Sequence, residues 1–190
     1  MKKIFFTLLF CQFLFAADSH QMVGFRYTVS PGVWMSNYQQ KVPGHEVKVS
    51  TLLSLAIGMQ AGLRVSILFA EYSIIWCFSP YSERPKSRDA TYFSMMGGNI
   101  GLSFGGIPIE PYAGVEQGRY ALSSGGEPTY TTSVLKAGVN LVFPFVKDIL
   151  RGGIKAEYRR MTPTEDSHGV LPSGITTTAE VYLISFMFGL

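Results

Sequence analysis

The sequence predicts an all-β fold, an eight-stranded antiparallel up-and-down barrel that spans a membrane and follows a cleavable signal peptide. Three observations predict it. The 190-residue chain is 47% hydrophobic but only 15% charged, against roughly 25% charged residues in an average soluble domain. After the N-terminus, no apolar run reaches the roughly 18 residues that a spanning helix requires. Apolar and polar residues instead alternate with period two, in stretches joined by connections of alternating length.

The first 17 residues are predicted to be the signal peptide, and residues 18–190 the barrel domain. Two lysines precede an apolar run over residues 4–15, and Ala16 and Ala17 follow as the small residues that a signal peptidase requires. A chain with this leader is expected to be exported. As a barrel of this kind, it is expected to reside in the cell outer membrane.

Charge and cysteine content exclude further classes of protein. The formal net charge of +3 comes from 16 basic and 13 acidic residues. They form no stripe of one sign, so nucleic acid is not expected as a partner. Cleavage removes Lys2, Lys3 and Cys11. Because Cys77 is then the single cysteine, no intramolecular disulfide is expected to stabilise the domain.

Eight stretches rich in β-branched and aromatic residues are the predicted strands. They cover residues 22–34, 47–60, 63–77, 91–104, 109–121, 131–143, 149–161 and 176–190. Short turns are predicted at residues 61–62, 105–108 and 144–148, and longer polar connections at residues 37–46, 80–90, 122–130 and 162–175. Short periplasmic turns and long external loops are typical of up-and-down barrels in outer membranes.

The first three strands carry irregular features. Pro31-Gly32 interrupts the first strand and predicts a bulge that turns Trp34 outward. In the third strand, Glu71 shares its phase with apolar residues, so one face is inconsistent unless a bulge or a rim position intervenes. A membrane helix over residues 52–70 is the competing interpretation, and it would hold Arg64 in hydrocarbon at a cost of a few kcal/mol.

The fifth, sixth and seventh strands indicate which face of the barrel is polar. In each of them an apolar set alternates with a set that mixes charge and glycine. Glycine suits the crowded lumen of an eight-stranded barrel better than a water-facing surface. The opposite assignment would place Lys136 and Lys155 on lipid, at roughly 2–4 kcal/mol each near the midplane. A solvated face of a soluble sandwich is the remaining alternative.

The inward charges are predicted to form a network. Symmetric closure of the two hairpins places Glu116 opposite Lys136, and Lys136 opposite Glu157, across three adjacent strands. Charges persist in a low-dielectric interior when they are paired and hydrogen-bonded. The predicted lumen charge network consists of Arg26, Glu110, Glu116, Lys136, Arg151, Lys155, Glu157 and Arg159.

Aromatic residues gather near the ends of the predicted strands. Amphipathic rings favour the boundary between membrane and water, where the ring is buried and its polar atom is hydrated. The predicted membrane-interface aromatics are Trp34, Trp76, Tyr92, Tyr120 and Tyr158.

The C-terminal strand carries a family resemblance. Tyr182, Ile184, Phe186, Phe188 and Leu190 stand at alternate positions up to the last residue. This resembles the terminal strand by which the assembly machinery recognises bacterial outer-membrane barrels, which most often ends in Phe rather than Leu. The mature chain resembles the small OmpA/OmpX-type barrels, and the resemblance implies eight strands and assembly through this signal.

Residues for catalysis are sparse. Asp166, Ser167 and His168 are adjacent in the last long connection, whereas a catalytic triad needs groups that converge in space. His45 has no second histidine at metal-binding spacing. No catalytic, cofactor-binding or metal-binding residue is therefore predicted, and no cofactor.

The expected function is that of a non-enzymatic outer-membrane barrel with a filled lumen, which acts as an anchor or recognises an extracellular ligand with its long loops. Outer-membrane lipid and the assembly machinery are the other expected partners. The candidate ligand contacts in the loops are Tyr38, Lys41, Tyr81, Arg84, Lys86, Arg88 and Tyr130. The alternatives are a lipid-modifying barrel enzyme that uses Ser167 or Asp166 with His168, and a periplasmic lipocalin-like carrier.

Overall fold

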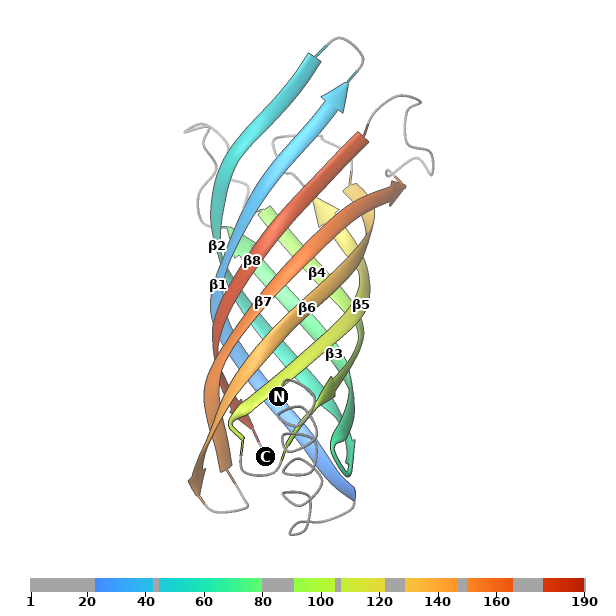
Figure 1. Ribbon diagram of the computed structural model, residues 1–190. Helices are drawn as coiled ribbons and strands as arrows, with labels where there is room; N and C mark the ends of the chain where they lie inside the picture. Colours follow the sequence, from blue (N-terminus) through green and yellow to red (C-terminus); the bar gives the residue numbers. More distant parts are fainter. Residues whose placement is uncertain are drawn as a thin grey trace, which may run out of the picture.

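The computed structural model describes residues 23–42, 45–79, 91–104, 107–121, 129–146, 150–165 and 176–189. Within them, eight strands form one closed barrel in chain order, so that β8 pairs back onto β1 (Figure 1). The strands are β1 (Val23–Val42), β2 (His45–Val65), β3 (Leu68–Ser79), β4 (Thr91–Leu102), β5 (Ile109–Ala121), β6 (Thr129–Val146), β7 (Leu150–Glu165) and β8 (Thr176–Gly189). The predicted eight-stranded antiparallel barrel is confirmed. The predicted signal peptide lies outside the described residues.

Closure of the barrel explains how strands can cross hydrocarbon. Every neighbouring pair of strands is antiparallel, and the β1–β8 pairing removes the two edges that an open sheet would leave. Backbone N–H and C=O groups find partners in the adjacent strand, as they must where no water is available. Among the described residues, no helix is long and apolar enough to cross a membrane.

The turn predicted at Ala61-Gly62 is wrong. The β2 strand continues to Val65, and the turn lies at Ser66 and Ile67, where Ser66 adopts a left-handed φ of 56°. Gly62 serves close packing instead, because a Cβ there would lie 2.0 Å from the carbonyl oxygen of Ala70. The shifted turn also removes the inconsistency in the third strand, since Glu71 now belongs to a uniform inward-facing set.

The long connection predicted over residues 37–46 is also wrong. There β1 runs on to Val42, β2 begins at His45, and the two strands stay paired up to that end. Polar sequence does not prevent strand pairing, because the ladder is formed by backbone hydrogen bonds. This β1–β2 hairpin reaches further than any other pair of strands at the loop end of the barrel (Figure 1).

The outer face of the barrel is an apolar band. Its exposed large side chains come from all eight strands, with Phe25, Leu55, Tyr72 and Ile100 as examples from the first four. Their alternation with buried neighbours follows the strand period of two. A face of this composition is suited to lipid rather than to water.

Replacing Ile100 by Lys tests which solvent surrounds this band. Ile100 is 68% exposed on the outer face of β4. In lipid, the substitution is expected to destabilise the barrel by about 2–4 kcal/mol, measured as the urea midpoint of unfolding in phospholipid vesicles. On a water-facing surface the same change would cost less than about 0.5 kcal/mol.

Candidate functional site in the barrel interior

Eight charged side chains are buried inside the barrel. They are the cations Arg26, Lys136, Lys155 and Arg159 and the carboxylates Glu71, Glu110, Glu116 and Glu157. They come from β1, β3, β5, β6 and β7, at positions that alternate with the lipid-facing residues. Four positive charges face four negative ones, so the buried set has no net charge.

The first cluster lies near the short-turn end, around Arg26. Its Nη1 and Nη2 donate to the two carboxylate oxygens of Glu110, at 3.1 and 2.7 Å, and its Nε donates to Glu71 Oε1 at 2.8 Å. Ser103 Oγ donates to Glu110 Oε1 at 2.5 Å. The guanidinium carbon of Arg26 also lies 4.2 Å from the centre of the Phe69 ring. This cluster joins β1, β3 and β5 across the interior.

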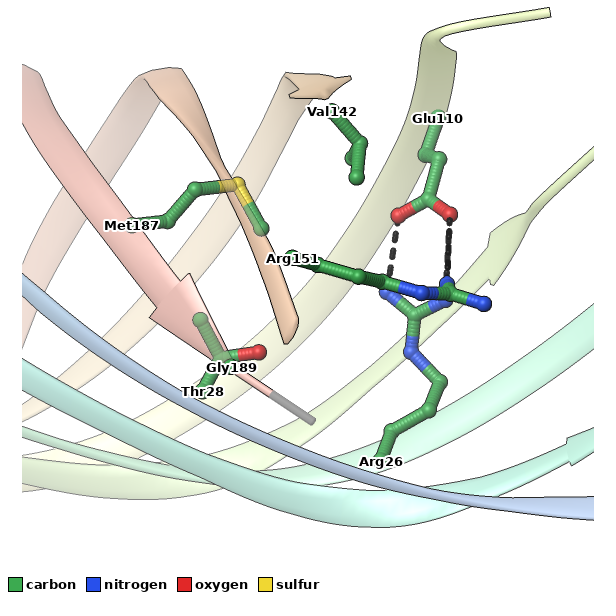
Figure 2. A pocket seen from close by; sticks show the side chains of 7 residues that line it. All are labelled: Arg26, Thr28, Glu110, Val142, Arg151, Met187 and Gly189. Carbon is green, nitrogen blue, oxygen red and sulfur yellow. Dashed lines mark hydrogen bonds and ion pairs between the residues drawn. The ribbon is translucent and has the colours of Figure 1, made fainter. Parts of the chain in front are cut away.

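A small pocket adjoins this cluster (Figure 2). Its volume is about 10 Å³, close to the minimum for a single water molecule. Arg151 lines this pocket, with Nη1 3.8 Å from Glu110 Oε1. The lining residues are Arg26, Thr28, Glu110, Val142, Arg151, Met187 and Gly189. A space of this size does not accommodate an organic substrate.

The second cluster occupies the middle of the barrel and begins at Glu116 on β5. Its Oε1 accepts from Lys136 Nζ and, at 2.7 Å, from Ser73 Oγ. Its Oε2 accepts from Arg159 Nη1 at 2.5 Å. Lys136 also donates to Ser73 Oγ at 2.9 Å. Glu116 thus holds two cations and a hydroxyl from three other strands.

Glu157 on β7 completes the second cluster. It accepts from Arg159 Nε and, at 2.6 Å, from the Tyr112 hydroxyl, and its Oε2 lies 3.3 Å from Lys155 Nζ. The Lys155 ammonium lies 5.4 Å from the centre of the Tyr112 ring, and the Arg159 guanidinium 5.2 Å from that of Trp34. Each buried charge therefore has a partner of opposite sign, which offsets the large cost of its desolvation.

The predicted register of this network is wrong by two residues in each hairpin. Gly114, not Glu116, stands opposite Lys136, and Arg159, not Glu157, stands on its other side. The loop between β5 and β6 is shorter than assumed, since Thr129 already pairs with Ala121, and β6 extends to Val146 before its turn. Lys136 still reaches Glu116, because long side chains on one face interact diagonally.

The structure places all eight residues of the predicted network on the inner face. Seven of them are buried, and Arg151 is half-buried at the rim. The prediction missed Glu71, because the misplaced turn left its phase ambiguous. It also missed Ser73, Ser103 and Tyr112, whose hydroxyls donate to the carboxylates. Ser73 and Tyr112 each follow an inward-facing glutamate by two residues, and this signal could have identified them, whereas no charged residue lies near Ser103 in the sequence.

An apolar layer covers the network on the loop side. It contains Trp34, Ala56, Ile75, Cys77, Met95, Val134, Met161, Ala179, Val181 and Leu183, all buried. The outward orientation predicted for Trp34 is therefore wrong. The β1–β2 register continues unbroken through Pro31 and Gly32 and shifts only between Ser36 and Tyr38, so the alternation that buries Arg26 also buries Trp34. The charged clusters and the apolar layer thus lie one above the other in the described interior.

The other predicted interface aromatics fall into two groups. Trp76 and Tyr158 have the outward phase, and the Tyr158 ring contacts that of Tyr182 on the neighbouring β8 in a tilted arrangement, with 5.5 Å between the ring centres. The side chains of Tyr92 and Tyr120 lie outside the described part of the structure. Of the predicted assembly signal, Tyr182, Ile184, Phe186 and Phe188 project outward, and Leu190 lies outside the described residues.

The remaining sequence candidates cannot be placed. Asp166, Ser167 and His168 lie outside the described residues, as do Tyr81, Arg84, Lys86 and Arg88, and the side chains of Tyr38, Lys41 and Tyr130 are likewise not described. Within the described ranges, no group of three His, Cys, Asp or Glu side chains is arranged to hold a metal ion. In the described interior the carboxylates are paired with buried cations, an arrangement that connects strands.

Comparison with known proteins supports the fold. No family model and no curated protein sequence matches the chain. Among solved structures, Neisserial surface protein A (NspA) matches with a TM-score of 0.54 and 13% identity, over 90% of this chain and 99% of that one. Ail of Yersinia pestis matches with a TM-score of 0.47 and 11% identity, over 85% and 97%. The outer membrane protease OmpT of Escherichia coli matches with a TM-score of 0.44 and 10% identity, over 91% and 99%. The chain has the fold of the small eight-stranded outer-membrane β-barrels, like that of NspA.

Proposed function

We propose that this protein is an exported, non-enzymatic barrel of the outer membrane, which acts through the surface that it raises above the membrane. The observation that carries the proposal is the combination of an apolar outer band with a filled, charge-compensated interior. The outer band favours lipid, and the described interior is occupied by buried charges and an apolar layer, with a pocket of only about 10 Å³ beside Arg26. The loop-side surface is then the part of the molecule available to a ligand.

The uneven height of the barrel supports a role in recognition. The strands β1 and β2 have 20 and 21 residues, whereas β3 and β4 have 12 each. About ten residues of tilted strand suffice to cross the membrane. The β1–β2 hairpin therefore extends well beyond the lipid, as a paired ladder rather than a flexible loop (Figure 1). Such a projection presents contacts at little entropic cost.

Cell fractionation combined with gel migration tests the membrane assignment. The protein is expected in the outer-membrane fraction, extractable with detergent, and its unboiled form is expected to migrate differently from its boiled form. Recovery in the soluble periplasmic fraction without any shift would instead indicate the lipocalin-like carrier. Mass spectrometry of lipid A from cells with and without the protein tests the enzyme alternative, and an unchanged spectrum is expected.

The filled interior predicts that the barrel does not conduct ions in discrete steps. Purified protein inserted into a planar lipid bilayer is expected to leave the baseline current unchanged, because the clusters around Glu110 and Glu116 and the apolar layer block the axis in series. A general porin in the same bilayer serves as positive control. Reproducible conductance steps that scale with protein concentration would contradict a sealed lumen.

The C-terminal strand supports a further part of the proposal, recognition by the assembly machinery. Phe186 and Phe188 are 63% and 55% exposed on the outer face of β8, next to the seam where β8 meets β1. Before β8 pairs with β1, both the unpaired edge and the outer face of β8 are available to a partner. Replacing both phenylalanines by alanine is expected to reduce the amount of heat-modifiable protein in cells but not the refolding of purified protein in detergent.

A further inference from the structure

The pocket beside Arg26 lies where a glycine interrupts a row of inward-facing side chains (Figure 2). Gly189 of β8 stands opposite Arg151 of β7 on one side and opposite Thr28 of β1 on the other. A Cβ at Gly189 would lie 3.0 Å from the Thr28 hydroxyl oxygen and 2.3 Å from the carbonyl oxygen of Tyr27. The absent side chain therefore leaves room for one small atom between the arginine and the threonine.

The Arg151 guanidinium has hydrogen-bond donors to offer at this place. Its Nη1 lies 3.8 Å from Glu110 Oε1, which is beyond hydrogen-bond distance. That oxygen already accepts from Ser103 Oγ at 2.5 Å and from Arg26 Nη1 at 3.1 Å. Among the described residues, Arg151 thus has an ion-pair partner at a distance but no side-chain hydrogen bond, and its side chain is 39% exposed at the mouth. It can bind a further acceptor without losing a contact.

The short-turn end of the described interior carries a surplus of positive charge. Its charged side chains are three arginines and two glutamates, namely Arg26, Arg64, Arg151, Glu71 and Glu110. Lys147 and Asp148, in the adjoining turn, lie outside the described residues and have opposite charges. A monovalent anion would balance the surplus, whereas a phosphate dianion would exceed it. The charge balance therefore favours a ligand with one negative charge.

Size and donor geometry favour a carboxylate. The pocket volume of about 10 Å³ admits one oxygen atom or an ion of similar size. A guanidinium group binds a carboxylate with two parallel hydrogen bonds, and the hydroxyl of the buried Thr28 can donate another. Val142 and Met187 supply apolar walls, which strengthen an ion pair by lowering the local dielectric constant.

We propose that Arg151 and Thr28, on either side of Gly189, bind a carboxylate group that enters the barrel at its short turns. One carboxylate oxygen occupies the space over Gly189, and the other stays at the mouth with the Arg151 guanidinium. The rest of the ligand remains outside, so the carboxylate stands at the end of a flexible chain. The ligand is a periplasmic one, and this part of the inference rests on the proposed membrane location.

The test is a titration of the folded barrel in maltoside micelles, followed by the NMR signals of the Thr28 and Gly189 backbone amides. The probes are the peptide acetyl-Ala-Ala with a free carboxylate, the same peptide with a C-terminal amide, and sodium chloride. The free acid is expected to bind saturably and about tenfold more tightly than the amide or chloride. Arg151→Gln is expected to weaken binding of the acid about tenfold, and Thr28→Val about threefold, because each removes donors to the carboxylate.

Arg119→Gln is the matched control, because it makes the same change at an exposed arginine near the loop end of β5. Its affinity for the acid is expected to equal that of the wild type. Absence of saturable binding, equal binding of the amide, or an equal loss in the Arg119 variant would overturn the proposal. Chloride binding as tight as that of the acid would overturn the assignment to a carboxylate, since a free halide would then occupy the pocket.

Folding and membrane location are measured separately from this site. Gel migration of each variant reports whether the barrel has formed, so lost binding by an unfolded variant is recognised. The titration is carried out in detergent and does not depend on where the protein resides in the cell. Failure of the carboxylate site therefore leaves the fractionation result unchanged, and failure of the membrane assignment leaves the titration unchanged.

Discussion

Replacing Glu157 by Gln is expected to destabilise the folded barrel by about 3–5 kcal/mol. The Glu157 carboxylate forms an ion pair with Lys155 and accepts hydrogen bonds from Arg159 and, at 2.6 Å, from the Tyr112 hydroxyl. The amide removes the negative charge while keeping the volume, so two buried cations lose compensation in a low-dielectric interior. The measurement is the urea dependence of unfolding in detergent, with the fraction of protein in the folded gel band as the readout.

Two further variants separate loss of compensation from general damage. Glu180→Gln makes the same chemical change on the outer face and is expected to cost no more than about 1 kcal/mol, as exposed pairs do. Adding Lys155→Met to Glu157→Gln removes the cation that has lost its carboxylate and is expected to recover part of the stability. Equal losses for the interior and exterior variants would mean that the network does not stabilise the barrel.

Replacing Gly97 by Ala is expected to cost about 3 kcal/mol or more, or to prevent folding altogether. Gly97 faces inward on β4, directly opposite Glu116. A Cβ there would lie 2.0 Å from the carbonyl oxygen of Val115 and 2.5 Å from the Cα of Glu116. Both are backbone atoms, so β5 must move as a whole and carry the Glu116 carboxylate away from Lys136 and Arg159.

The adjacent Gly98 is the control for Gly97. It faces outward, and the one heavy atom within 4 Å of its added Cβ is the carbonyl oxygen of Glu71, at 3.9 Å. Gly98→Ala is expected to stabilise the barrel by about 0.5–1 kcal/mol, because alanine loses less conformational freedom on folding. Refolding yield and urea midpoint distinguish the two variants. Equal refolding yields and urea midpoints for the two variants would show that the barrel interior has room for a side chain at position 97.

Several features of the interior could be predicted because they depend on strand period alone. Once β5, β6 and β7 were recognised, alternation assigned Glu116, Lys136 and Glu157 to one side and the apolar residues to the other. The prediction that glycine suits a crowded lumen also has a structural counterpart. At Gly138 an added Cβ would lie 2.5 Å from the Tyr112 hydroxyl oxygen, so the glycine makes room for that ring.

Register and turn position could not be predicted in the same way. Glycine is common in turns, but Gly62 lies within a strand, where it allows close approach of the neighbouring backbone. The turn lies at Ser66 instead. A shift of two residues preserves which face each side chain occupies, so the alternation of the sequence does not detect it. Loop length and cross-strand contacts decide between such registers, and both belong to the tertiary structure.

The sequence by itself determined the environment of this protein. The sequence specifies a strand barrel with an apolar outer face through period-two alternation, scarce charge and connections of unequal length. These are local features, so they can be read from residues that are close together in the sequence. The tertiary structure decided which charges meet, that Trp34 joins an apolar layer above them, and that β1 and β2 continue beyond the membrane. These features depend on which residues the closed barrel brings together across its interior. Arg26 and Glu110, for example, are far apart in the sequence, and a local sequence pattern does not encode their contact.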